Sequence, residues 1–596
     1  MKRATQVERV EALREEMRKA GVQGYLIPGT DPHQSEYPAT HFHGRQWISG
    51  FHGSAGTVVI TMEHAGLWTD SRYFLEAEKA LEGTPFTLFK METPGVPAYP
   101  DWIASTLERG DTLACDARLV SVATVAAIEE PLERRGIHFV PGEDLLARIW
   151  EERPPLPTTP VYLHDERYAG ESAGSKIARL VERLRGLRAQ TLLVTALDEI
   201  AWLLNIRGSD VLYSPVTVSY LLLDNGTLTL FIESSKLSPE VTSHLQALAV
   251  RIEPYEAVTD ALSALPQERI VLVDEGKLNS LLFRALPEGV EVVHGSSPIT
   301  EMKAIKNEIQ KAGIRAAMRR DGAALATFFV ELQEALSRGE RPRERELQER
   351  LRERRAEQEL FVAEAFGTIA GYAGNGAIVH YAPGENDSAE VSDDAILLLD
   401  SGGQYLDGTT DITRTTHFGK PTEAQRRDYT LVLKGHLALG MTPFPKGTTG
   451  HQLDTLARQF LWQEMENYGH GTGHGVGHFL NVHEGPQRIS QKALGVALEP
   501  GMLISNEPGV YRTGAWGIRI ENLVLVEETP ATGTEEFYRL ETVTLFPYER
   551  KLIDTERLTP AEREWVDAYH RRVRRELSPL VSQKVADWLE EQCAPL

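Results

Sequence analysis

The sequence predicts a multidomain fold of mixed class, in which α/β domains precede a larger α+β domain. The chain has 596 residues with 41% apolar content, enough to bury several cores and to form about three or four domains. Its first half repeats one order of helix and strand signals. Its second half combines long helical stretches with antiparallel hairpins, the pattern of an α+β domain.

The first two domains are predicted from a loose internal similarity. After a helical stretch, GVQGYLIPG matches RAQTLLVTA, WISGFHGSAG matches WLLNIRGSD, and GTVVIT matches VSYLLLD with GTLTLFI. Each copy then has a late apolar strand, DTLACDA or ERIVLVDEG. The Pro-rich stretch EERPPLPTTPVY separates the copies. We therefore expect two related α/β domains, over residues 1–155 and 160–298.

The third domain is expected over residues 303–548. It opens with a helical stretch from about Ala304 to Leu336 and a second helix rich in Arg and Glu, before the strand-rich segments. Residues 549–596 alternate apolar and charged side chains at helical spacing, which predicts a C-terminal helical extension packed against this domain. Three aromatic residues of the extension are expected in the core or at a dimer contact: Trp565, Tyr569 and Trp588.

Composition excludes several classes of function. The formal net charge of −23 at pH 7 disfavours nucleic acid and anionic membranes as partners. The two cysteines, Cys115 and Cys593, lie far apart and indicate a reducing compartment rather than a disulfide framework. The charged N-terminal stretch lacks the apolar segment of a signal peptide, and no later stretch has transmembrane length. We expect a cytoplasmic protein.

Two acidic residues flank a predicted hairpin. Asp400 ends the apolar run AILLLD, and Asp411 precedes ITRT. Asp407-Gly408 between them predicts a tight turn, so two strands can bring both carboxylates together. A carboxylate inside an apolar strand is costly without a partner, and a bound cation supplies one. Asp407 itself is typical of a structural turn and is left out of the ligand set.

Three more side chains able to bind a metal follow in the sequence. His474 lies between two glycines, Glu507 precedes Pro508-Gly509, which ends its strand, and Glu521 follows the strand-like GIRI. Four carboxylates and one imidazole suit manganese, cobalt or iron, with zinc also compatible. This is more negative charge than one divalent ion carries, which indicates two ions sharing carboxylates.

These segments resemble a known family. DSGGQYLDGTTDITRT, HGTGHGVGHFLNVHEGP, ISNEPGVY and WGIRIEN are similar to the pita-bread metallopeptidases, and within them to the three-domain cytosolic type of Xaa-Pro aminopeptidase (aminopeptidase P). The similarity extends to YLIPGTDPHQSEYPA and RQWISGFHGSAGTVVIT near the N-terminus and to ERLTPAEREWVDAYHRRV near the C-terminus. The resemblance implies two creatinase-like α/β domains and a pita-bread catalytic domain with its metals between two pseudo-symmetric halves.

The resemblance also implies roles for individual residues. It assigns the ligands of two divalent ions to five residues: Asp400, Asp411, His474, Glu507 and Glu521. It assigns catalytic roles to His380, His470 and His483, with Arg519 beside the second glutamate. We expect Glu507 to act as general base, Arg519 to orient Asp400 or its neighbours, and His380 and His483 to donate hydrogen bonds to the tetrahedral intermediate.

The implied activity is release of the N-terminal residue from peptides with proline in the second position. A hydroxide between two divalent ions, most consistent with Mn²⁺ and also with Co²⁺ or Zn²⁺, would attack the Xaa-Pro bond. The N-terminal domains would roof the active site and limit substrate size, and the resemblance implies a homodimer. The main alternative is prolidase, which cuts Xaa-Pro dipeptides. A metal-free, peptide-binding pita-bread module is the alternative outside enzymes, and the five retained ligands argue against it.

Other motifs do not carry a second function. His417 and His478 match no family role and are expected to be core or solvated histidines. Gly170–Gly174 matches the G-x-S-x-G nucleophile elbow, but the strand that this elbow requires is missing before it. Ser172 is therefore expected near the N-terminal end of a helix.

Overall fold

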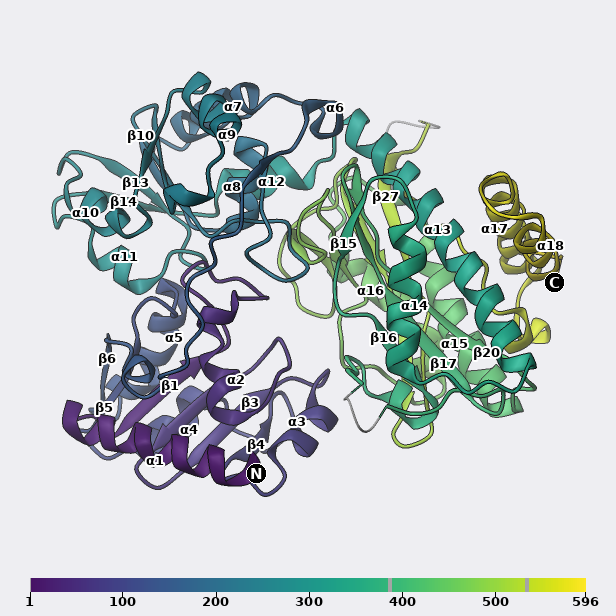
Figure 1. The fold of residues 1–596 in the computed structure, drawn as a ribbon, viewed down its shortest axis with the longest axis horizontal. Helices are drawn as coiled ribbons and strands as arrows, with labels where there is room; N and C mark the ends of the chain where they lie inside the picture. Colours follow the sequence, from purple (N-terminus) through teal and green to yellow (C-terminus); the bar gives the residue numbers. More distant parts are fainter. Residues whose placement is uncertain (1, 384–387, 531–534) are drawn as a thin grey trace. The chain divides into compact units, whose positions relative to one another are not determined.

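The structure is a computed structural model that describes residues 2–383, 388–530 and 535–596. The chain forms two compact units. The first contains Met1–His164 and Glu171–Thr300, and the second contains Asp165–Gly170 and Glu301–Leu596 (Figure 1). Among the described residues, no helix is both long and apolar enough to cross a membrane.

The first unit begins with a six-stranded mixed sheet. Its strands are β1 (Gly24–Pro28), β2 (Thr57–Thr61), β3 (Ala65–Thr69), β4 (Thr87–Lys90), β5 (Thr112–Asp116) and β6 (His138–Gly142). They lie in the order β4-β3-β2-β1-β5-β6. β2 is antiparallel to β1 and β3, and the other pairs are parallel. The accompanying helices are α1 (Lys2–Ala20), α2 (Gly44–Ser49), α3 (Phe74–Leu81), α4 (Tyr99–Thr106) and α5 (Val122–Glu133).

The second domain of this unit repeats that topology. Its sheet contains β8 (Thr191–Val194), β10 (Tyr220–Asp224), β11 (Thr227–Phe231), β12 (Val250–Glu253), β13 (Ile270–Val273) and β14 (Glu291–His294). The order β12-β11-β10-β8-β13-β14 and the strand directions are those of the first sheet. Its helices are α7 (Ala173–Gly186), α8 (Leu197–Leu204), α9 (Pro239–Ala247), α10 (Val258–Ser263) and α11 (Ser280–Arg284). The expectation of two related α/β domains is confirmed.

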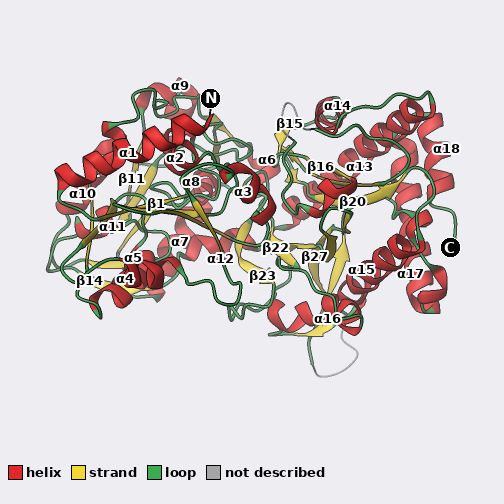
Figure 2. Ribbon diagram, turned by 90° about the horizontal axis from the view of Figure 1, so that it is seen from below, coloured by secondary structure: helices red, strands yellow, loops and turns green. Residues whose placement is uncertain are grey.

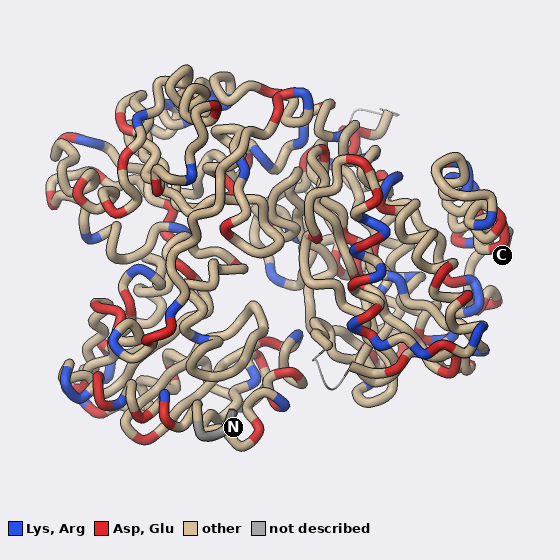
Figure 3. The backbone as a smooth tube through the Cα atoms, in the orientation of Figure 1, with Lys and Arg blue, Asp and Glu red and all other residues tan. Residues whose placement is uncertain are grey.

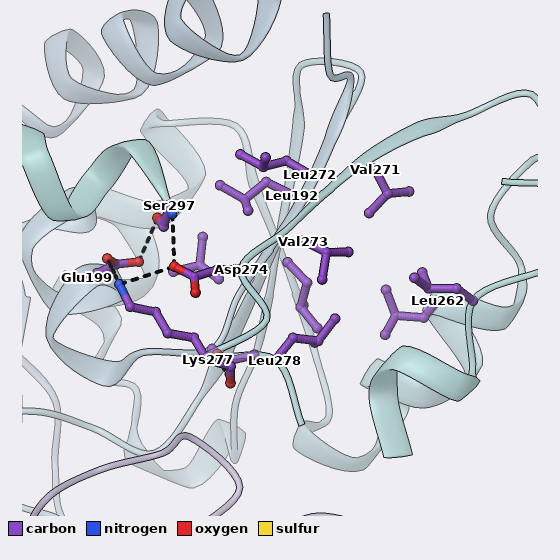
Figure 4. Close-up of a pocket in the computed structure, with 14 residues that line it drawn as sticks. Leu192, Glu199, Leu262, Val271, Leu272, Val273, Asp274, Lys277, Leu278 and Ser297 are labelled. Carbon is purple, nitrogen blue, oxygen red and sulfur yellow. Dashed lines mark hydrogen bonds and ion pairs between the residues drawn. The ribbon is translucent and has the colours of Figure 1, made fainter. Parts of the chain in front are cut away.

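A small pocket in the second domain is lined on one side by apolar strand residues and on the other by polar groups (Figure 4). Glu199 is buried there, and its carboxylate accepts hydrogen bonds from Lys277 Nζ at 2.5 Å and Ser297 Oγ at 2.8 Å. Ser297 N–H donates to Asp274 Oδ2 at 2.9 Å. The buried Glu199 carboxylate is paired and hydrogen-bonded. We therefore interpret the polar side of this pocket as part of the domain's structure.

Ser172 caps a helix, as expected, and is no nucleophile elbow. Its hydroxyl accepts a hydrogen bond from Ser175 N–H at the start of α7. The short helix α6 (Glu166–Ala169) just before it belongs to the second unit. There Asn307 Nδ2 donates to Ala169 O at 2.9 Å. Because residues 165–170 belong to the second unit, the chain passes from one unit to the other more than once.

Along the chain, the second unit divides into two halves, each with two long helices and several strands (Figure 2). The first half pairs α13 (Glu308–Ser337) with α14 (Glu344–Ala356), and the second pairs α15 (Glu423–Met441) with α16 (Gly450–Gln463). Acidic and basic residues alternate along α14 (Figure 3), and most of them are solvated as expected, whereas Glu344 and Arg355 are buried. The helical stretch expected from Ala304 starts later, because Asn307 forms a capping box with Gln310 at the start of α13.

Short sheets complete each half. The first half contains β15 (Phe361–Glu364), β16 (Ile369–Tyr372), β17 (Ile396–Ser401), β18 (Gly403–Tyr405), β19 (Gly408–Thr409) and β20 (Ile412–His417). The second contains β21 (Phe444–Pro445), β22 (Gly473–Gly475), β23 (Glu484–Ile489), β24 (Leu503–Asn506), β25 (Gly509–Arg512), β26 (Trp516–Arg519), β27 (Asn522–Glu528) and β28 (Phe537–Thr542). Six of these strands form one sheet in the order β21-β28-β27-β24-β22-β23.

The C-terminal helices α17 (Pro560–Leu577) and α18 (Gln583–Gln592) pack on this unit. Tyr569 is buried, and its hydroxyl donates to Phe546 O at 2.9 Å. Trp565 stacks on Tyr569, and Trp588 Nε1 donates to Gln333 Oε1 at 2.9 Å. Tyr569 is therefore a core residue, as expected, whereas Trp565 and Trp588 are only half-buried and pack against that core, so a dimer contact stays a prediction for these two.

Helices α15 and α16 approach so closely at Gly435 that a side chain does not fit. A Cβ atom at Gly435 would lie 2.1 Å from Ala457 O, whereas one at Gly440 on the same helix would lie 3.7 Å from Asn506 Nδ2. We expect Gly435→Ala to lower the free energy of unfolding by about 1–3 kcal/mol, because the helices must separate. Thermal unfolding of the metal-loaded protein measures this. Gly440→Ala is the matched control and should leave the unfolding temperature near wild type; equal losses in both variants would contradict the explanation.

Candidate metal centre

Asp400 and Asp411 are brought together by the first half's strands. β17 pairs antiparallel with β20, so that Asp400 lies opposite Thr413, and Asp411 directly precedes β20. Between them, β18 and β19 form the predicted hairpin, but its two-residue turn is Leu406-Asp407 rather than Asp407-Gly408, because Gly408 already pairs with Tyr405. Both carboxylates are almost fully buried. The hairpin expectation is confirmed, and it explains how one segment delivers two acids to one place.

The second half supplies an imidazole and two more acids. His474 lies in β22, Glu507 directly follows β24, and Glu521 precedes β27. His474 Nε2 lies 3.5 Å from Asp411 Oδ2 and 3.4 Å from Glu507 Oε1. Ligand atoms of Asp411, His474 and Glu521 all lie within 4.8 Å of one another. The two halves therefore converge on one cluster.

The tautomer of His474 directs the lone pair of its outer nitrogen toward the acids. Nδ1 lies 3.0 Å from Gly475 O, and a carbonyl oxygen only accepts, so Nδ1 carries the proton of the neutral ring. Nε2 then presents a lone pair to the carboxylates. When two ligand atoms each lie about 2.1 Å from one ion, the distance between the two ligand atoms is roughly 3–3.5 Å. His474 Nε2 lies at such distances from the oxygens of Asp411 and Glu507.

The cluster carries more negative charge than the protein balances. Burial, followed by the charges of Asp400 and Glu507, raises the pKa of Asp411 well above its usual value. Burial and the charge of Asp411 do the same for Glu521. Burial raises the pKa of Glu507 to about 7, although Arg519 opposes that shift. Protons or bound cations must therefore compensate this site.

The donor set fits divalent cations. Asp400 Oδ1 and Glu521 Oε1 are buried without a hydrogen-bond partner among residues 2–383, 388–530 and 535–596. Buried acceptors are almost always paired, so these oxygens point to ligands that complete the site. The ligand atoms are carboxylate oxygens and one imidazole nitrogen, which suits ions of the Mn²⁺, Co²⁺ or Zn²⁺ class.

Hydroxyl groups and one guanidinium fix the orientation of the acids. Thr413 Oγ1 donates to Glu521 Oε2 at 2.8 Å, and Ser505 Oγ donates to Glu507 Oε1 at 3.1 Å. Arg519 Nη2 donates to Asp400 Oδ2 at 2.5 Å, so the structure places Arg519 against the acid that it was expected to orient. Such contacts hold ligands in place before a metal binds.

Tyr511 is a site residue that the sequence analysis missed. Its hydroxyl accepts a hydrogen bond from Arg519 Nη1 at 2.8 Å and lies 2.8 Å from His470 Nε2. His470 Nδ1 lies 2.8 Å from Gly471 O, so Nδ1 carries the ring proton and Nε2 accepts from Tyr511. Tyr511 lies on β25 and Glu507 follows β24, so no strand period relates the two residues in the sequence.

The other two predicted histidines lie on segments anchored by buried charges. The His483 ring lies 4.3 Å from the His474 ring and nearly perpendicular to it. Glu484, the next residue, is paired with Lys303 at 2.6 Å and also with Lys306. His380 follows Val379, whose carbonyl oxygen lies 3.4 Å from Arg519 Nη2.

Glu344 anchors the segment that carries His380. Its buried carboxylate accepts hydrogen bonds from Tyr372 N–H at 2.7 Å, from Asn375 Nδ2 at 3.0 Å and from Tyr381 OH at 2.8 Å. Tyr381 directly follows His380, so this anchor fixes the backbone next to the histidine. A charged acceptor with several donors is among the stronger local constraints available to a loop.

The residues excluded from the site have structural surroundings. Asp407 forms an ion pair with Arg320 and does not belong to the cluster of Asp411, His474 and Glu521. His417 is buried and its Nδ1 accepts from Gly419 N–H at 3.1 Å. His478 is also buried. These two histidines were expected to be core or solvated residues, and both lie in the core.

Comparisons with known proteins agree with this geometry. Residues 312–528 match the model of metallopeptidase family M24, and residues 536–596 match the C-terminal region of peptidase M24. Residues 9–149 and 152–310 each match a creatinase/prolidase N-terminal domain model. The M24 match runs from within α13 to the end of β27 and so includes parts of both halves of the second unit.

Curated relatives resemble the whole chain. A probable Xaa-Pro aminopeptidase P of Tuber melanosporum is 40% identical over 615 residues, with 99% of each chain covered. One from Fusarium vanettenii is 43% identical over 588 residues, with 95% of this chain and 94% of the relative covered. The similarity therefore includes both N-terminal domains.

Solved structures agree as well. X-prolyl aminopeptidase from Caenorhabditis elegans, described as a cytosolic enzyme with a di-nuclear active site, is 33% identical with a TM-score of 0.96. The match covers 99% of this chain and 100% of that chain. A prolidase from Pyrococcus horikoshii, 22% identical with a TM-score of 0.50, covers 63% of this chain and shares the fold. The chain therefore belongs to the Xaa-Pro aminopeptidase P group of metallopeptidase family M24, and it is a metal-dependent aminopeptidase rather than a prolidase.

Proposed function

We propose that this chain removes the N-terminal residue from peptides with proline in the second position, using two divalent ions. The buried cluster of acids around His474 carries this proposal, because its charge and its two unpaired oxygens call for cations. We propose five ligands: Asp400, Asp411, His474, Glu507 and Glu521. Mn²⁺ fits this hard, oxygen-rich donor set best. When bound, such an ion pair lowers the pKa of a water molecule and polarises the scissile carbonyl.

Glu507 is the proposed general base. It lies 3.4 Å from His474 Nε2, and Ser505 Oγ holds its Oε1. A carboxylate in this position can take a proton from the attacking water and pass it to the departing proline nitrogen. That nitrogen would be a poor leaving group as an anion, so a proton must be delivered to it before the C–N bond breaks.

Histidines complete the proposed site. His483, beside His474, and His380 are proposed to donate hydrogen bonds to the tetrahedral intermediate, each worth on the order of 3 kcal/mol. Both ring nitrogens of His470 already face protein oxygens, so His470 is proposed to act through Tyr511. Arg519 is proposed to hold Asp400 and Tyr511 in fixed positions.

The cellular context is also a proposal. We infer a cytoplasmic homodimer, supported by the Caenorhabditis elegans neighbour described as cytosolic and by the family resemblance. The N-terminal domains are proposed to limit the length of the peptide admitted. Peptides are the proposed partners; nucleic acid and membranes are not, given the net charge of −23.

Metal removal should change how stability depends on pH. In the metal-free protein, the raised pKa values of Asp411, Glu507 and Glu521 mean that the folded state binds more protons than the unfolded state. Its stability should therefore fall as the pH rises from about 4.3, the pKa of an unfolded glutamate, through the value of about 7 for Glu507. Thermal unfolding with a chelator and with saturating Mn²⁺ measures this. Identical curves in both conditions would contradict a cation site.

Replacing Asp411 by Ala should abolish metal loading and turnover together, because it removes a ligand from the centre of the cluster. Elemental analysis and a peptide hydrolysis assay check this. Asp407→Ala is the matched control on the same hairpin, since Asp407 pairs with Arg320, and it should keep its metal. An Asp411→Ala variant with wild-type metal content and activity would refute the assignment.

Substrate choice tests the proposed activity against prolidase. We expect the Mn²⁺-loaded protein to cleave Xaa-Pro-Pro and other Xaa-Pro-Yaa peptides, and to spare matched Xaa-Ala-Yaa peptides, because a site shaped for the proline ring rejects ordinary amides. Released amino acids can be quantified by chromatography. Cleavage of the Xaa-Pro dipeptide alone would indicate prolidase, and binding without cleavage would indicate a peptide-binding module.

A further inference from the structure

A buried ion pair on α16 lies behind the segment that carries His470. Asp454 and Arg458 are one helical turn apart, and Arg458 Nε lies 2.6 Å from Asp454 Oδ2. Their side chains are 3% and 1% exposed, respectively. Burial of two charges costs as much as their attraction returns unless further hydrogen bonds complete both groups. The groups that form these further hydrogen bonds therefore show what the ion pair holds in place.

The guanidinium of Arg458 binds the backbone that leads to His470. Nη1 donates to Tyr468 O at 2.7 Å and to Asn467 Oδ1 at 3.0 Å, and Nη2 donates to His470 O at 2.8 Å. The guanidinium also lies 3.8 Å from the centroid of the Tyr468 ring. A planar fork of donors can hold several acceptors at once, which a lysine ammonium on its flexible stem cannot reproduce.

Asp454 binds the other end of the same segment. Its Oδ1 accepts a hydrogen bond from Thr472 Oγ1 at 2.6 Å, and Thr472 O accepts one from Glu507 N–H at 2.8 Å. The next residue, Gly473, packs so closely on β24 that a Cβ atom there would lie 1.9 Å from Ser505 O. Thr472 therefore transmits the position of α16 to the backbone of Glu507.

The segment reaches the acids by a second route as well. His470 Nε2 meets Tyr511, Tyr511 meets Arg519, and Arg519 Nη2 binds Asp400. The segment HGTGHG has three glycines within six residues, so its backbone has little intrinsic preference. External anchors must therefore set its position.

We propose that Arg458, paired with Asp454, is a positioning residue for the metal centre. It fixes residues 467–472 and through them sets Glu507, His470 and the Tyr511–Arg519–Asp400 chain. This inference rests on the proposed function, because it concerns the geometry in which that reaction occurs. Removing such an outer contact typically lowers metal affinity or activity by about 10- to 100-fold.

The test compares Arg458→Lys with a structural control. The control is Lys236→Met, which removes the cation of an equally buried pair, Lys236 and Asp210, 2.7 Å apart and 2% and 0% exposed. All measurements are made with saturating Mn²⁺, well below the unfolding temperature. We expect Arg458→Lys to lower kcat about 10- to 100-fold and to alter the Mn²⁺ electron paramagnetic resonance spectrum. Lys236→Met should lower thermal stability and keep the wild-type kcat and spectrum.

A milder variant covers the case in which Arg458→Lys fails to fold. Thr472→Val keeps the shape of the side chain and removes the hydroxyl that binds Asp454. It should lower kcat in the same direction and shift the same spectrum. Wild-type kcat and spectrum in a folded Arg458→Lys or Thr472→Val protein would overturn the proposal. A wild-type protein that binds Mn²⁺ but cleaves no Xaa-Pro-Yaa peptide would refute the proposed function instead, and the spectra would still decide the positioning role.

Discussion

The structure depends on an excess of buried negative charge held between two halves of one domain. Four carboxylates and a neutral imidazole converge, and Arg519 supplies one compensating charge. Buried carboxylates that face one another cannot all ionise without cations. The strands supply the acids from both halves, so the site exists only when the two halves are assembled. For the same reason we expect metal binding and folding of this domain to be linked.

The histidine-bearing segments are loops, and buried charged side chains hold each of them. Glu344 on α14 binds the segment around His380, Arg458 on α16 binds the carbonyl of His470, and Glu484 beside His483 binds two lysines. Charge-assisted hydrogen bonds are short and directional. A metallopeptidase needs its acid–base groups placed to within a fraction of an ångström, and such contacts give flexible segments that precision.

The N-terminal half contains two domains of the same topology. Its two sheets share strand order and strand directions, and the polar cluster around Glu199 is fully paired. The prolidase neighbour covers 63% of this chain. The full-length relatives match both N-terminal domains, which separates this group from the shorter members of the fold.

The sequence by itself determined the domain order and the presence of a hairpin between Asp400 and Asp411, and it supplied the five ligands that we propose. Those features depend on local patterns, namely strand and helix periods, turn residues and acids in apolar strands. It also placed Ser172 near the N-terminal end of a helix, where the structure shows it as the cap. The start of α13 was set too early, because the capping box at Asn307 was not recognised.

Only the tertiary structure decided which side chains meet. Tyr511, Arg458 and Glu344 act on the site through contacts with residues far along the chain or on other elements. No local pattern specifies such partners, because they are selected by how helices and sheets pack. The tautomers of His470 and His474 were decided in the same way, since each depends on the carbonyl that its Nδ1 faces.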